Sequence, residues 1–275
     1  MTKVGNEVLK ETKVALVGFG SQGTRIAGAV SDQQDMELVG ICLKEPDISA
    51  LMGFRKGFPI YLVDSDYAEA FKKAGIDVQG SISDLLSQVD VVVDVTPSGV
   101  GRRNKEEFYS KYKVKSVFQA GEPLEVADIP AFMSTINYED ARKASSVRIP
   151  SPFAVSLVRT LKPLDAEFGI KHVTCTLIRP RTEPMRGYQG PVDTIIPDKP
   201  HVAHKKFRDE MRRMLPKDVI FASLAVSSIL LAVGVVVVDL ERRASTEKVI
   251  DLLCRIPRSI IVRGDMGLHS TDAIF

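Results

Sequence analysis

KVALVGFGSQGTRIAGAV, residues 13–30, is the stretch of sequence that decides the fold. Its apolar start at residues 14–17 predicts a buried strand, and residues 24–30 predict the first helix. Between them stand three glycines in the pattern Gly-x-Gly-x-x-Gly, namely Gly18, Gly20 and Gly23. A strand, this turn and a helix in direct succession indicate a dinucleotide-binding domain of the Rossmann type.

Each residue of this turn has its own structural role in a dinucleotide-binding site. Gly18 permits the tight turn, Gly20 lets the backbone approach a pyrophosphate, and Gly23 lets the helix pack on the strand. The backbone amides near Ser21 and Gln22 point at the phosphates from the positive end of the helix dipole. The alternative is a glycine-rich turn without a ligand, which the flanking strand and helix disfavour. The predicted cofactor-binding residues of the turn are Gly18, Phe19, Gly20, Ser21, Gln22 and Gly23.

The end of the second predicted strand, residues 37–43, bears on the choice between NAD and NADP. Lys44 and Glu45 follow this strand directly. A carboxylate at the strand tip binds the ribose hydroxyls of NAD, whereas a cation near it accommodates the 2′-phosphate of NADP. Lys44 therefore favours NADP over NAD. Glu45 argues for the opposite preference, and a lysine that only faces solvent is the alternative interpretation of Lys44.

Strands and helices alternate through the first half of the chain, which predicts a parallel sheet with helical crossovers. We expect this doubly wound α/β domain to cover residues 1–148, with further strands at 60–63, 90–95 and 116–119 and helices at 67–74 and 104–112. Residues 149–275 are expected to form a smaller α+β domain with a mixed sheet. Its predicted strands cover residues 171–178, 192–196, 219–224, 234–240 and 259–262, and its helices cover residues 152–168, 205–214 and 245–255.

Residues 219–238, VIFASLAVSSILLAVGVVVV, contain no charge and are long enough to cross a membrane. Their ends are β-branched or aromatic, which is typical of strands, and serines with one glycine interrupt the middle. We therefore expect two strands around a short helical turn, buried in a sheet that is covered on both faces. No membrane span is predicted.

The composition is that of a soluble globular protein, with 44% hydrophobic residues and a net charge of +2 over 275 residues. So small a charge does not by itself indicate a polyanionic partner. Cys42, Cys175 and Cys254 are scattered, show no metal-binding spacing and are expected to be reduced thiols. The polar N-terminus lacks the apolar core of a signal peptide. These features predict a cytoplasmic protein without a metal site.

Several ordered segments of the chain form a specific pattern: KVALVGFGSQGTRIAGAV, VVVDVTPSGVGRRNK, VFQAGE, INYEDA, LVRTL with LDAEFGI, GPVDTIIPD, and IPRSIIV with GLHSTDAI. Taken together, these segments resemble the archaeal type of glyceraldehyde-3-phosphate dehydrogenase. The resemblance implies a Rossmann domain, a catalytic domain built on a mixed sheet and, usually, a tetramer. It also implies that Ser21 and Gln22 lie on the cofactor phosphates. The residues that it implies on the nicotinamide side are Thr96, Pro97, Ser98, Gly99, Gln119 and Gly121.

The sequence departs from this family where the chemistry is expected. The family's second domain opens with Ser-Cys-Asn-Thr-Thr, whose cysteine attacks the aldehyde. Aligned with that motif, Ser151 is the serine and Pro152 occupies the cysteine position. The remaining three positions hold Phe153, Ala154 and Val155. Ser151 is a poor nucleophile, because the sequence places no histidine to activate it. No catalytic residue is therefore assigned.

The other functional positions of the family are only partly retained. The family's histidine-bearing segment aligns with residues 231–234, which contain no imidazole. One arginine of the phosphate-binding pair is retained as Arg179, with Pro180 next to it and Arg181 one step further. His204 is a loose match to a loop histidine. Arg179, Arg181 and His204 are thus the candidate phosphate or substrate residues.

The chain stops at Phe275, soon after the segment GLHSTDAI, whereas the resemblance implies several more elements. We therefore expect a shortened second domain that leaves a sheet edge open. A second copy of the chain in a homo-oligomer, or another protein in a hetero-assembly, would cover that edge.

Three functions follow as hypotheses, and whether the chain is an enzyme stays open. The favoured one is an NAD(P)-binding, repurposed or non-catalytic protein without phosphorylating dehydrogenase activity. The first alternative is an active NAD(P)-dependent oxidoreductase that acts on a small aldehyde or phosphorylated substrate. The second alternative is an RNA- or protein-binding module, supported by basic residues whose interleaved acids favour a solvated helix face instead. These basic residues are Arg102, Arg103, Lys105, Lys111, Lys113 and Lys115, and then Lys205, Lys206, Arg208, Arg212 and Arg213.

Overall fold

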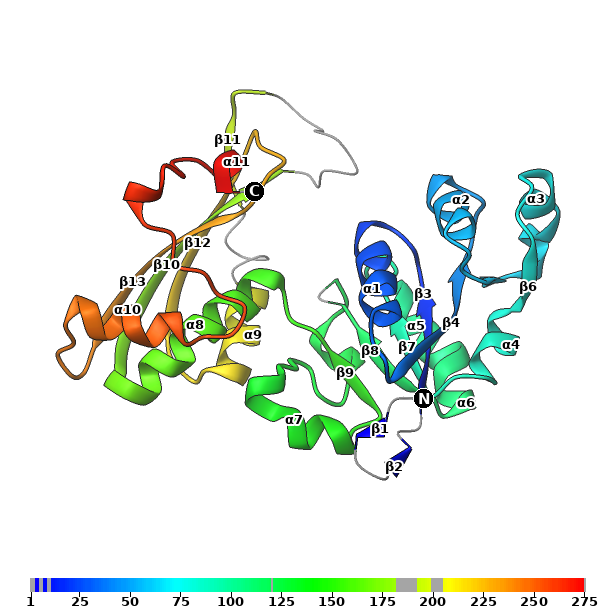
Figure 1. Cartoon of the computed structure of the whole chain (residues 1–275), viewed down its shortest axis with the longest axis horizontal. Helices are drawn as coiled ribbons and strands as arrows, with labels where there is room; N and C mark the ends of the chain where they lie inside the picture. Colours follow the sequence, from blue (N-terminus) through cyan, green and yellow to red (C-terminus); the bar gives the residue numbers. More distant parts are fainter. Residues whose placement is uncertain are drawn as a thin grey trace. The chain divides into compact units, whose positions relative to one another are not determined.

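A computed structural model describes residues 3–4, 7–8, 11–119, 121–181, 192–198 and 205–274 of the chain. The chain divides into two compact units, Met1–Pro150 and Ser151–Phe275. Figure 1 labels most of the helices and strands of both units. The division falls directly before helix α8, where Ser151 is the N-cap residue and Pro152 is the first helical residue.

The first unit is built on a seven-stranded parallel sheet with the strand order β6-β5-β4-β3-β7-β8-β9. This confirms the predicted doubly wound α/β fold. The strands are β3 (Thr12–Val17), β4 (Met36–Leu43), β5 (Ile60–Leu62), β6 (Val78–Ser81), β7 (Val91–Asp94), β8 (Lys115–Phe118) and β9 (Ser146–Arg148). Strands β1 (Lys3–Val4) and β2 (Glu7–Val8) form a separate antiparallel pair.

Helical segments connect these strands. They are α1 (Ser21–Ser31), α2 (Ile48–Arg55), η1 (Ser65–Tyr67), α3 (Ala68–Lys73), α4 (Ile82–Leu86), α5 (Val100–Asn104), the π-helical η2 (Lys105–Tyr109), α6 (Ser110–Tyr112), η3 (Leu124–Val126) and α7 (Ser134–Lys143). The sequence patterns predicted α1, α3 and the run from α5 to α6, but they missed α2, α4 and α7. The missed helices are short or carry a weak apolar stripe, so tertiary packing decides them.

Strand β3 lies at the point where the strand order of the sheet reverses. It pairs with β4 on one side and with β7 on the other. The chain runs outward from β3 to β6 and then returns to continue on the opposite side through β7, β8 and β9. Ligands of open parallel sheets bind at the carboxyl ends of the strands beside such a switch point. The topology therefore points to the loops that follow β3, β7 and β8.

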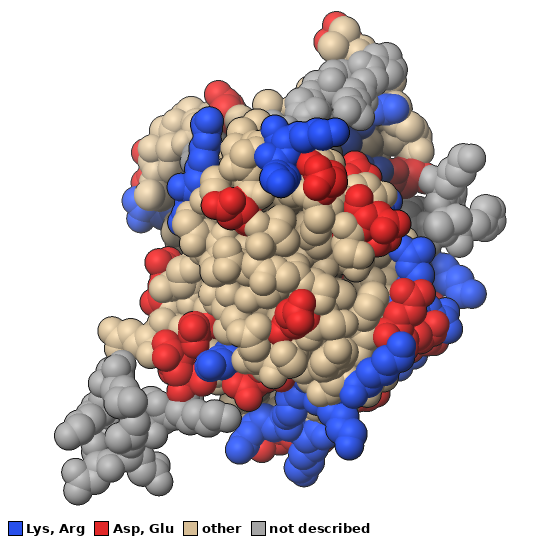
Figure 2. Space-filling model, turned by 90° about the vertical axis from the view of Figure 1, so that its right-hand side faces the viewer, with Lys and Arg blue, Asp and Glu red and all other residues tan. Residues whose placement is uncertain are grey.

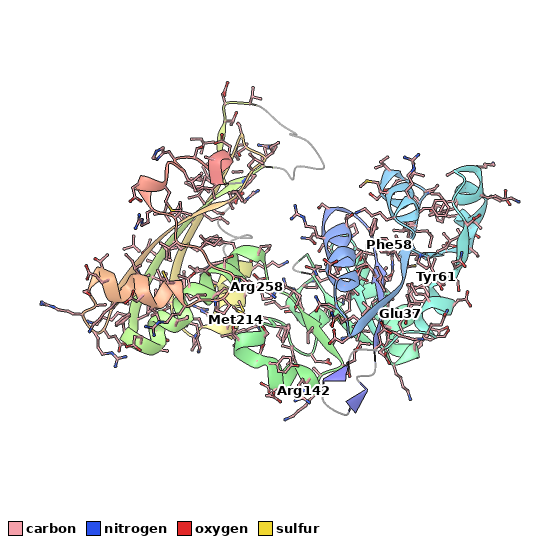
Figure 3. The ribbon with its side chains drawn as sticks, viewed as in Figure 1. Glu37, Phe58, Tyr61, Arg142, Met214 and Arg258 are labelled. Atoms are coloured by element: carbon pink, nitrogen blue, oxygen red, sulfur yellow. The ribbon has the colours of Figure 1, made fainter. Side chains whose placement is uncertain are left out.

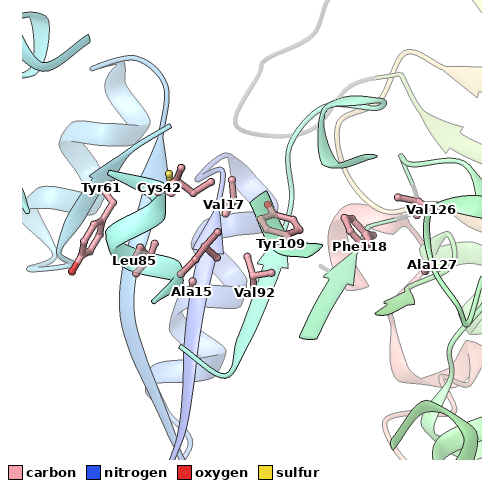
Figure 4. Close-up of a cluster of buried hydrophobic side chains, with 12 residues drawn as sticks. Ala15, Val17, Cys42, Tyr61, Leu85, Val92, Tyr109, Phe118, Val126 and Ala127 are labelled. Carbon is pink, nitrogen blue, oxygen red and sulfur yellow. The ribbon is translucent and has the colours of Figure 1, made fainter. Parts of the chain in front are cut away.

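The core of the first unit lies on both faces of the sheet. In β3, Ala15, Leu16 and Val17 have no exposed surface. Because side chains alternate along a strand, Ala15 and Val17 join one cluster and Leu16 joins the other. Figure 4 shows the first of these clusters, in which Tyr109 and Phe118 lie near Val92. Burial on both faces explains why these strands are almost continuously apolar.

The second unit contains a four-stranded mixed sheet in the order β11-β12-β10-β13. Its strands are β10 (Ile170–Pro180), β11 (Ile195–Pro197), β12 (Val219–Val226) and β13 (Val233–Leu240). Only the β10–β12 pair is parallel, which confirms the predicted mixed sheet. Its helices are α8 (Pro152–Phe168), α9 (Lys205–Met214) and α10 (Thr246–Cys254), followed by η6 (Gly264–Met266) and α11 (Thr271–Ile274).

The apolar stretch 219–238 forms two strands, as predicted, but the prediction of burial on both faces is wrong. Val235 is 53% exposed and Val237 is 61% exposed in β13, and Ile220 is 58% exposed in β12. Helices α8 and α9 contact β13 and β12 from one side of the sheet. The apolar residues on the other face have no such cover within the described part of this unit. The segment between the two strands has bends and no helical turn.

The apolar run at residues 259–262 does not form the strand that its pattern predicts. Ile260 is 86% exposed, and the run pairs with nothing in the described chain. An apolar run of this length does not distinguish a strand from an irregular segment. No helix among the described residues is long and apolar enough to cross a membrane.

Candidate functional site

The glycine turn after β3 has the geometry that the sequence pattern predicts. Gly18 has a φ of +90°, and a Cβ atom on it would lie 3.3 Å from the carbonyl carbon of Val95. A Cβ on Gly23 would lie only 2.6 Å from the carbonyl oxygen of Gly18. Neither position can take a side chain without a shift of backbone. By contrast, no atom lies within 4 Å of a Cβ on Gly20, so open space faces that residue.

Helix α1 begins at this open space. Gly20 is its N-cap residue and offers no side-chain acceptor, and the first turn contains no acidic residue. The positive end of the helix dipole at Ser21 and Gln22 therefore meets no carboxylate from the first turn. Phe19 is 3% exposed and packs edge-on against Phe58, with 5.8 Å between the ring centroids. Phe58 is labelled in Figure 3. Phe19 thus contributes its side chain to the core and only its backbone to the turn.

The three predicted cofactor loops come together at one end of the sheet. Val95, which follows β7, lies against the glycine turn, and its N–H donates to the carbonyl oxygen of Val17 at 2.9 Å. A Cβ on Gly121, after β8, would lie 3.9 Å from the backbone nitrogen of Ser98. The loop at Thr96–Gly99 is therefore next to both the glycine turn and the residues after β8. This arrangement fits a dinucleotide lying across the switch point.

A buried carboxylate fixes the beginning of the loop after β7. Asp94, 2% exposed, accepts hydrogen bonds from the N–H of Thr96 at 2.9 Å and from its hydroxyl at 2.5 Å. Its other oxygen accepts from Asn104 Nδ2 at 2.9 Å and from the Tyr109 hydroxyl at 2.6 Å. Asp94 therefore accepts four hydrogen bonds, two from Thr96 and two from the helical segment that follows. These bonds fix Thr96 relative to that segment. Such a network rigidifies a site when every member is satisfied.

A second buried carboxylate fixes the end of the same loop. Glu122 is 3% exposed, and its Oε1 accepts from the N–H groups of Gly99 at 2.8 Å and Gly101 at 2.9 Å. These N–H groups belong to the start of α5, so Glu122 caps that helix with a negative charge. Arg148, which is fully buried, donates from Nε to the backbone oxygen of Glu122 at 2.8 Å. Sequence reasoning missed both carboxylates, although a charged residue at the end of an apolar strand was visible.

Lys44 lies at the predicted place, just after β4. Its ammonium group is 3.7 Å from Glu45 Oε1, and both side chains are more than 60% exposed. The same ammonium group stands 5.7 Å from the centre of the Tyr67 ring. An exposed ion pair of this kind contributes little to stability, so Lys44 can exchange Glu45 for another anion.

In the second unit, the beginning of helix α8 is tied to α9 by a carboxylate that the sequence analysis missed. Glu210 is 1% exposed, and its Oε2 accepts from the Ser151 hydroxyl at 2.9 Å and from the Ser151 N–H at 3.2 Å. The same hydroxyl accepts from the N–H of Ala154 at 3.3 Å, which is the N-cap bond of α8. Ser151 therefore acts as a cap whose proton is directed to Glu210.

An aromatic cluster fills the space beside the start of α8. Phe153 lies 5.7 Å from Phe207 and 6.0 Å from Phe221 between ring centroids, and Phe207 stacks on Phe221 at 3.9 Å. A Cβ on Gly234 would lie 2.7 Å from Phe153 Cε2. Phe153, from the segment aligned with the family's catalytic motif, thus contacts Gly234, from the segment aligned with the family's histidine.

Of the candidate phosphate residues, Arg179 is engaged by the chain itself. Its Nε donates to Asp198 Oδ2 at 2.9 Å and its Nη2 donates to Asp198 Oδ1 at 2.5 Å. Hydrogen bonds to Asp198 raise the pKa of the Arg179 guanidinium above its usual value. Arg181 is exposed. His204 lies outside the described residues, and the described part of the chain contains no group of ligands that could hold a metal ion.

With this geometry in view, comparisons with known proteins assign the family. No protein-family model matches the chain. Glyceraldehyde-3-phosphate dehydrogenase from Methanothermus fervidus is 33% identical over 261 residues, which cover 95% of this chain and 77% of the relative. The enzyme from Aeropyrum pernix is 37% identical over 264 residues, which cover 95% of this chain and 76% of the relative. The chain belongs to the archaeal glyceraldehyde-3-phosphate dehydrogenase family.

Solved structures support the same fold at much lower identity. Aspartate semialdehyde dehydrogenase II from Vibrio cholerae superposes with a TM-score of 0.67 at 14% identity, over 90% of this chain and 80% of that one. Aspartate semialdehyde dehydrogenase with NADP from Candida albicans gives a TM-score of 0.63 at 17% identity, over 95% of this chain and 80% of that one. These likenesses show that the dehydrogenase fold is shared.

Two of the three cysteines are buried, and their thiols are poorly reactive. Cys42 in β4 has no exposed surface, and burial followed by the charge of Asp94 raises its pKa far above the usual range. Cys175 in β10 is 1% exposed, and burial raises its pKa to about 11. Thiols in this state are mostly protonated and therefore poorly nucleophilic near neutral pH. Cys254 is exposed at the end of α10.

Proposed function

We propose that this chain is an NAD(P)-binding member of the glyceraldehyde-3-phosphate dehydrogenase family that does not carry out the phosphorylating reaction. The observation that carries the proposal is the contact of Phe153 with Gly234 at the start of α8, beside Pro152. The ring belongs to the segment that aligns with the family's cysteine motif, and Gly234 belongs to the segment that aligns with the family's histidine. We propose a repurposed or non-catalytic role for the chain, as part of an assembly.

The chemistry of the reaction supports this proposal. Phosphorylating oxidation of an aldehyde requires a thiolate to form a hemithioacetal, a base to take up its proton, and a thioester that phosphate attacks. Pro152 supplies neither a thiol nor a backbone N–H, and Gly234 cannot accept a proton. The Ser151 hydroxyl is held between Glu210 and the N–H of Ala154, where it serves as a helix cap.

The dinucleotide would be held by the first unit. In the proposed site, the amides near Ser21 and Gln22 bind the pyrophosphate, and the loops at Thr96–Gly99 and Gln119–Gly121 line the nicotinamide side. A bound nicotinamide supplies hydride-transfer chemistry. Asp94 and Glu122 keep the loop after β7 in one conformation through their hydrogen bonds. We propose NADP over NAD, because Lys44 offers an exposed cation beside the ribose position.

The proposed assembly uses the uncovered face of the sheet in the second unit. The β-strand register places the side chains at 174, 176 and 178 of β10 on one face, together with their partners in β12 and β13. This face carries a row of apolar side chains, among them Ile220, Val233, Val235, Val237 and, from β11, Ile195. A contiguous apolar surface of this kind marks an interaction site. We propose that a second copy of the chain covers it, with a different protein as the alternative occupant.

The two alternative functions draw on other observations. An active NAD(P)-dependent oxidoreductase acting by simple hydride transfer is favoured by the retained glycine turn, since such chemistry needs no thiol. The basic residues that would support RNA binding have acidic partners. Arg102 pairs with Glu106 at 3.5 Å, and Arg212 pairs with Asp218 at 3.3 Å. In Figure 2, blue and red side chains are interspersed around a broad tan area on the face that is turned to the viewer. This mixture of charges favours an ordinary solvated surface over an RNA-binding surface.

The test of the proposed function is an assay of the purified chain with glyceraldehyde 3-phosphate, inorganic phosphate and NADP or NAD. We expect no phosphate-dependent formation of reduced cofactor, together with measurable binding of the dinucleotide by calorimetry. A steady, phosphate-dependent rate would overturn the loss of activity, and the absence of binding would overturn the cofactor assignment. Cell fractionation tests the proposed cytoplasmic location, in which the cysteines stay reduced.

A further inference from the structure

Lys44 lies beside a second loop at the carboxyl edge of the parallel sheet. Strands β4 and β5 are parallel neighbours that pair Leu43 with Leu62, and the Val63 N–H donates to the Leu43 carbonyl oxygen at 3.0 Å. The residues that follow the two strands therefore leave the sheet side by side. They do so at the edge where open parallel sheets bind their ligands.

The loop after β5 carries Tyr67, whose backbone and ring are both held in place. Asp64 is the N-cap residue of η1, and its side chain accepts from the Asp66 N–H at 3.0 Å. The carbonyl oxygen of Asp64 accepts from the Tyr67 N–H at 3.3 Å. The Tyr67 ring is half-buried and packs against the core cluster that contains Phe19 and Leu43. The core thus supports one side of this ring.

The Lys44 ammonium group stands 5.7 Å from the centre of the Tyr67 ring, within the range of a cation–π contact. The ring attracts the cation but is itself neutral, whereas Glu45, 3.7 Å from the ammonium group, compensates its charge. A lysine ammonium group has three N–H donors, so the ring contact leaves donors for an anion. Ordering a long side chain costs conformational entropy, and a contact that orders it before the ligand arrives lowers that cost on binding.

We propose that Tyr67 is a positioning residue of the cofactor site, and that its ring presents the Lys44 ammonium group to the 2′-phosphate of NADP. The inference rests on the proposed function, which supplies the dinucleotide and the role of Lys44. NAD carries a hydroxyl in place of the 2′-phosphate, so a positioned cation discriminates between the two cofactors. Tyr67 therefore acts on the choice of cofactor, whereas the glycine turn binds the pyrophosphate that both cofactors share.

The test is calorimetric titration of the full chain with NADP and with NAD at fixed ionic strength, and its readout is the ratio of the two affinities. The wild-type chain is compared with Tyr67→Leu, Tyr67→Phe, Lys44→Met and the double variant of Tyr67→Leu with Lys44→Met. We expect Tyr67→Leu to lower the NADP-to-NAD affinity ratio about twofold to fivefold, the effect of losing an exposed cation–π contact. Tyr67→Phe keeps the ring and should keep the ratio. When Lys44→Met is already present, Tyr67→Leu should leave the ratio unchanged.

A merely structural role of the ring would weaken both cofactors alike and leave the ratio unchanged. The matched control is Tyr138→Leu, at a tyrosine of α7 that is 52% exposed, and it should not alter the ratio. The proposal is overturned if Tyr67→Leu preserves or raises the ratio, or lowers it equally in the Lys44→Met background. Tyr67→Met replaces Tyr67→Leu, with the same outcomes, if the latter fails to fold. If wild type binds neither cofactor, the proposed function falls together with this inference; if it binds both and Tyr67→Leu preserves the ratio, only this inference falls.

Discussion

The hydroxyl of Tyr109 donates to Asp94 Oδ2 at 2.6 Å, and both residues are at most 2% exposed. This bond joins the π-helical segment η2 to the carboxylate that fixes the loop after β7. It links the packing of the first unit to the geometry of its candidate cofactor site.

Tyr109→Phe removes this bond and leaves the Asp94 carboxylate with one donor fewer. We expect the free energy of unfolding to fall by about 1–3 kcal/mol, the usual cost of a buried polar group that loses a partner. Chemical denaturation with both proteins measures this difference. Tyr112→Phe, at a tyrosine that is 39% exposed, is the matched control and should leave stability unchanged.

The same tyrosine makes the fold sensitive to alkaline pH. Burial, followed by the charge of Asp94, raises the pKa of Tyr109 well above its usual value. The folded-state pKa thus exceeds the unfolded value of about 10, so the stabilisation is complete below about pH 10 and declines as the pH rises further. Wild type should therefore lose stability more steeply than Tyr109→Phe above about pH 10, by up to about 1.4 kcal/mol per pH unit. If the stability of both proteins fell equally steeply with pH, Tyr109 would not be the source of the alkaline sensitivity.

Gly20→Val should abolish dinucleotide binding without unfolding the protein. No atom lies within 4 Å of the Cβ position, so the folded chain tolerates the side chain, whereas a pyrophosphate would meet it. Calorimetry with NADP and a thermal unfolding curve separate the two effects. Gly28→Val, at an equally open position of the same helix, is the control and should bind normally. Unchanged affinity in Gly20→Val would exclude the turn as the phosphate site.

Lys44→Ala should weaken NADP binding much more than NAD binding. The exposed ammonium group exchanges Glu45 for the 2′-phosphate, and hydrogen bonds to charged groups contribute about 1.5–3 kcal/mol, or roughly tenfold in affinity or more. Glu45→Gln should have the opposite effect, because it removes the competing carboxylate 3.7 Å away. Titration of each variant with both cofactors tests the preference. Equal losses for NADP and NAD would show that Lys44 does not contact the phosphate.

Pro152→Cys should not create phosphorylating dehydrogenase activity. A thiol at this position still has no imidazole from segment 231–234 to act as its base, since that segment contains no histidine and Gly234 faces Phe153. Loss of a general base alone costs about 10²–10⁴ in rate, and residues of a catalytic unit act together. The assay is phosphate-dependent cofactor reduction, with titration by a thiol reagent to show that the new cysteine is accessible. A sustained rate in this variant would mean that another group supplies the base.

Val235→Glu should disrupt self-association through the open face of the second unit. Val235 is 53% exposed on that face, and a buried charge without a partner strongly disfavours an interface. Sedimentation of wild type and variant measures the oligomeric state. Arg243→Glu, on an exposed residue after β13, is the control with a charge change. A wild-type monomer in solution, or an unchanged oligomer in Val235→Glu, would contradict the proposed interface.

The sequence by itself determined the first unit and its candidate cofactor loops. The glycines at 18, 20 and 23 act through local sterics, and the alternation of short apolar strands with helices is a local pattern. The same kind of information predicted helix α8 at its observed bounds, because Ser151 and Pro152 begin it and Gly169 ends it. The absence of a thiol at Pro152 was also visible from the resemblance alone.

Only the tertiary structure decided which of these residues meet. Glu122 binds Gly99 across 23 residues of sequence, and Ser151 binds Glu210 across 59. No local periodicity reveals such pairs, since they depend on how strands and helices stack. The exposure of β13 also depends on tertiary packing. Its valines predicted a strand correctly, but whether a strand is buried depends on what covers the sheet. The engagement of Arg179 by Asp198 likewise arises from the order of β11, β12 and β10.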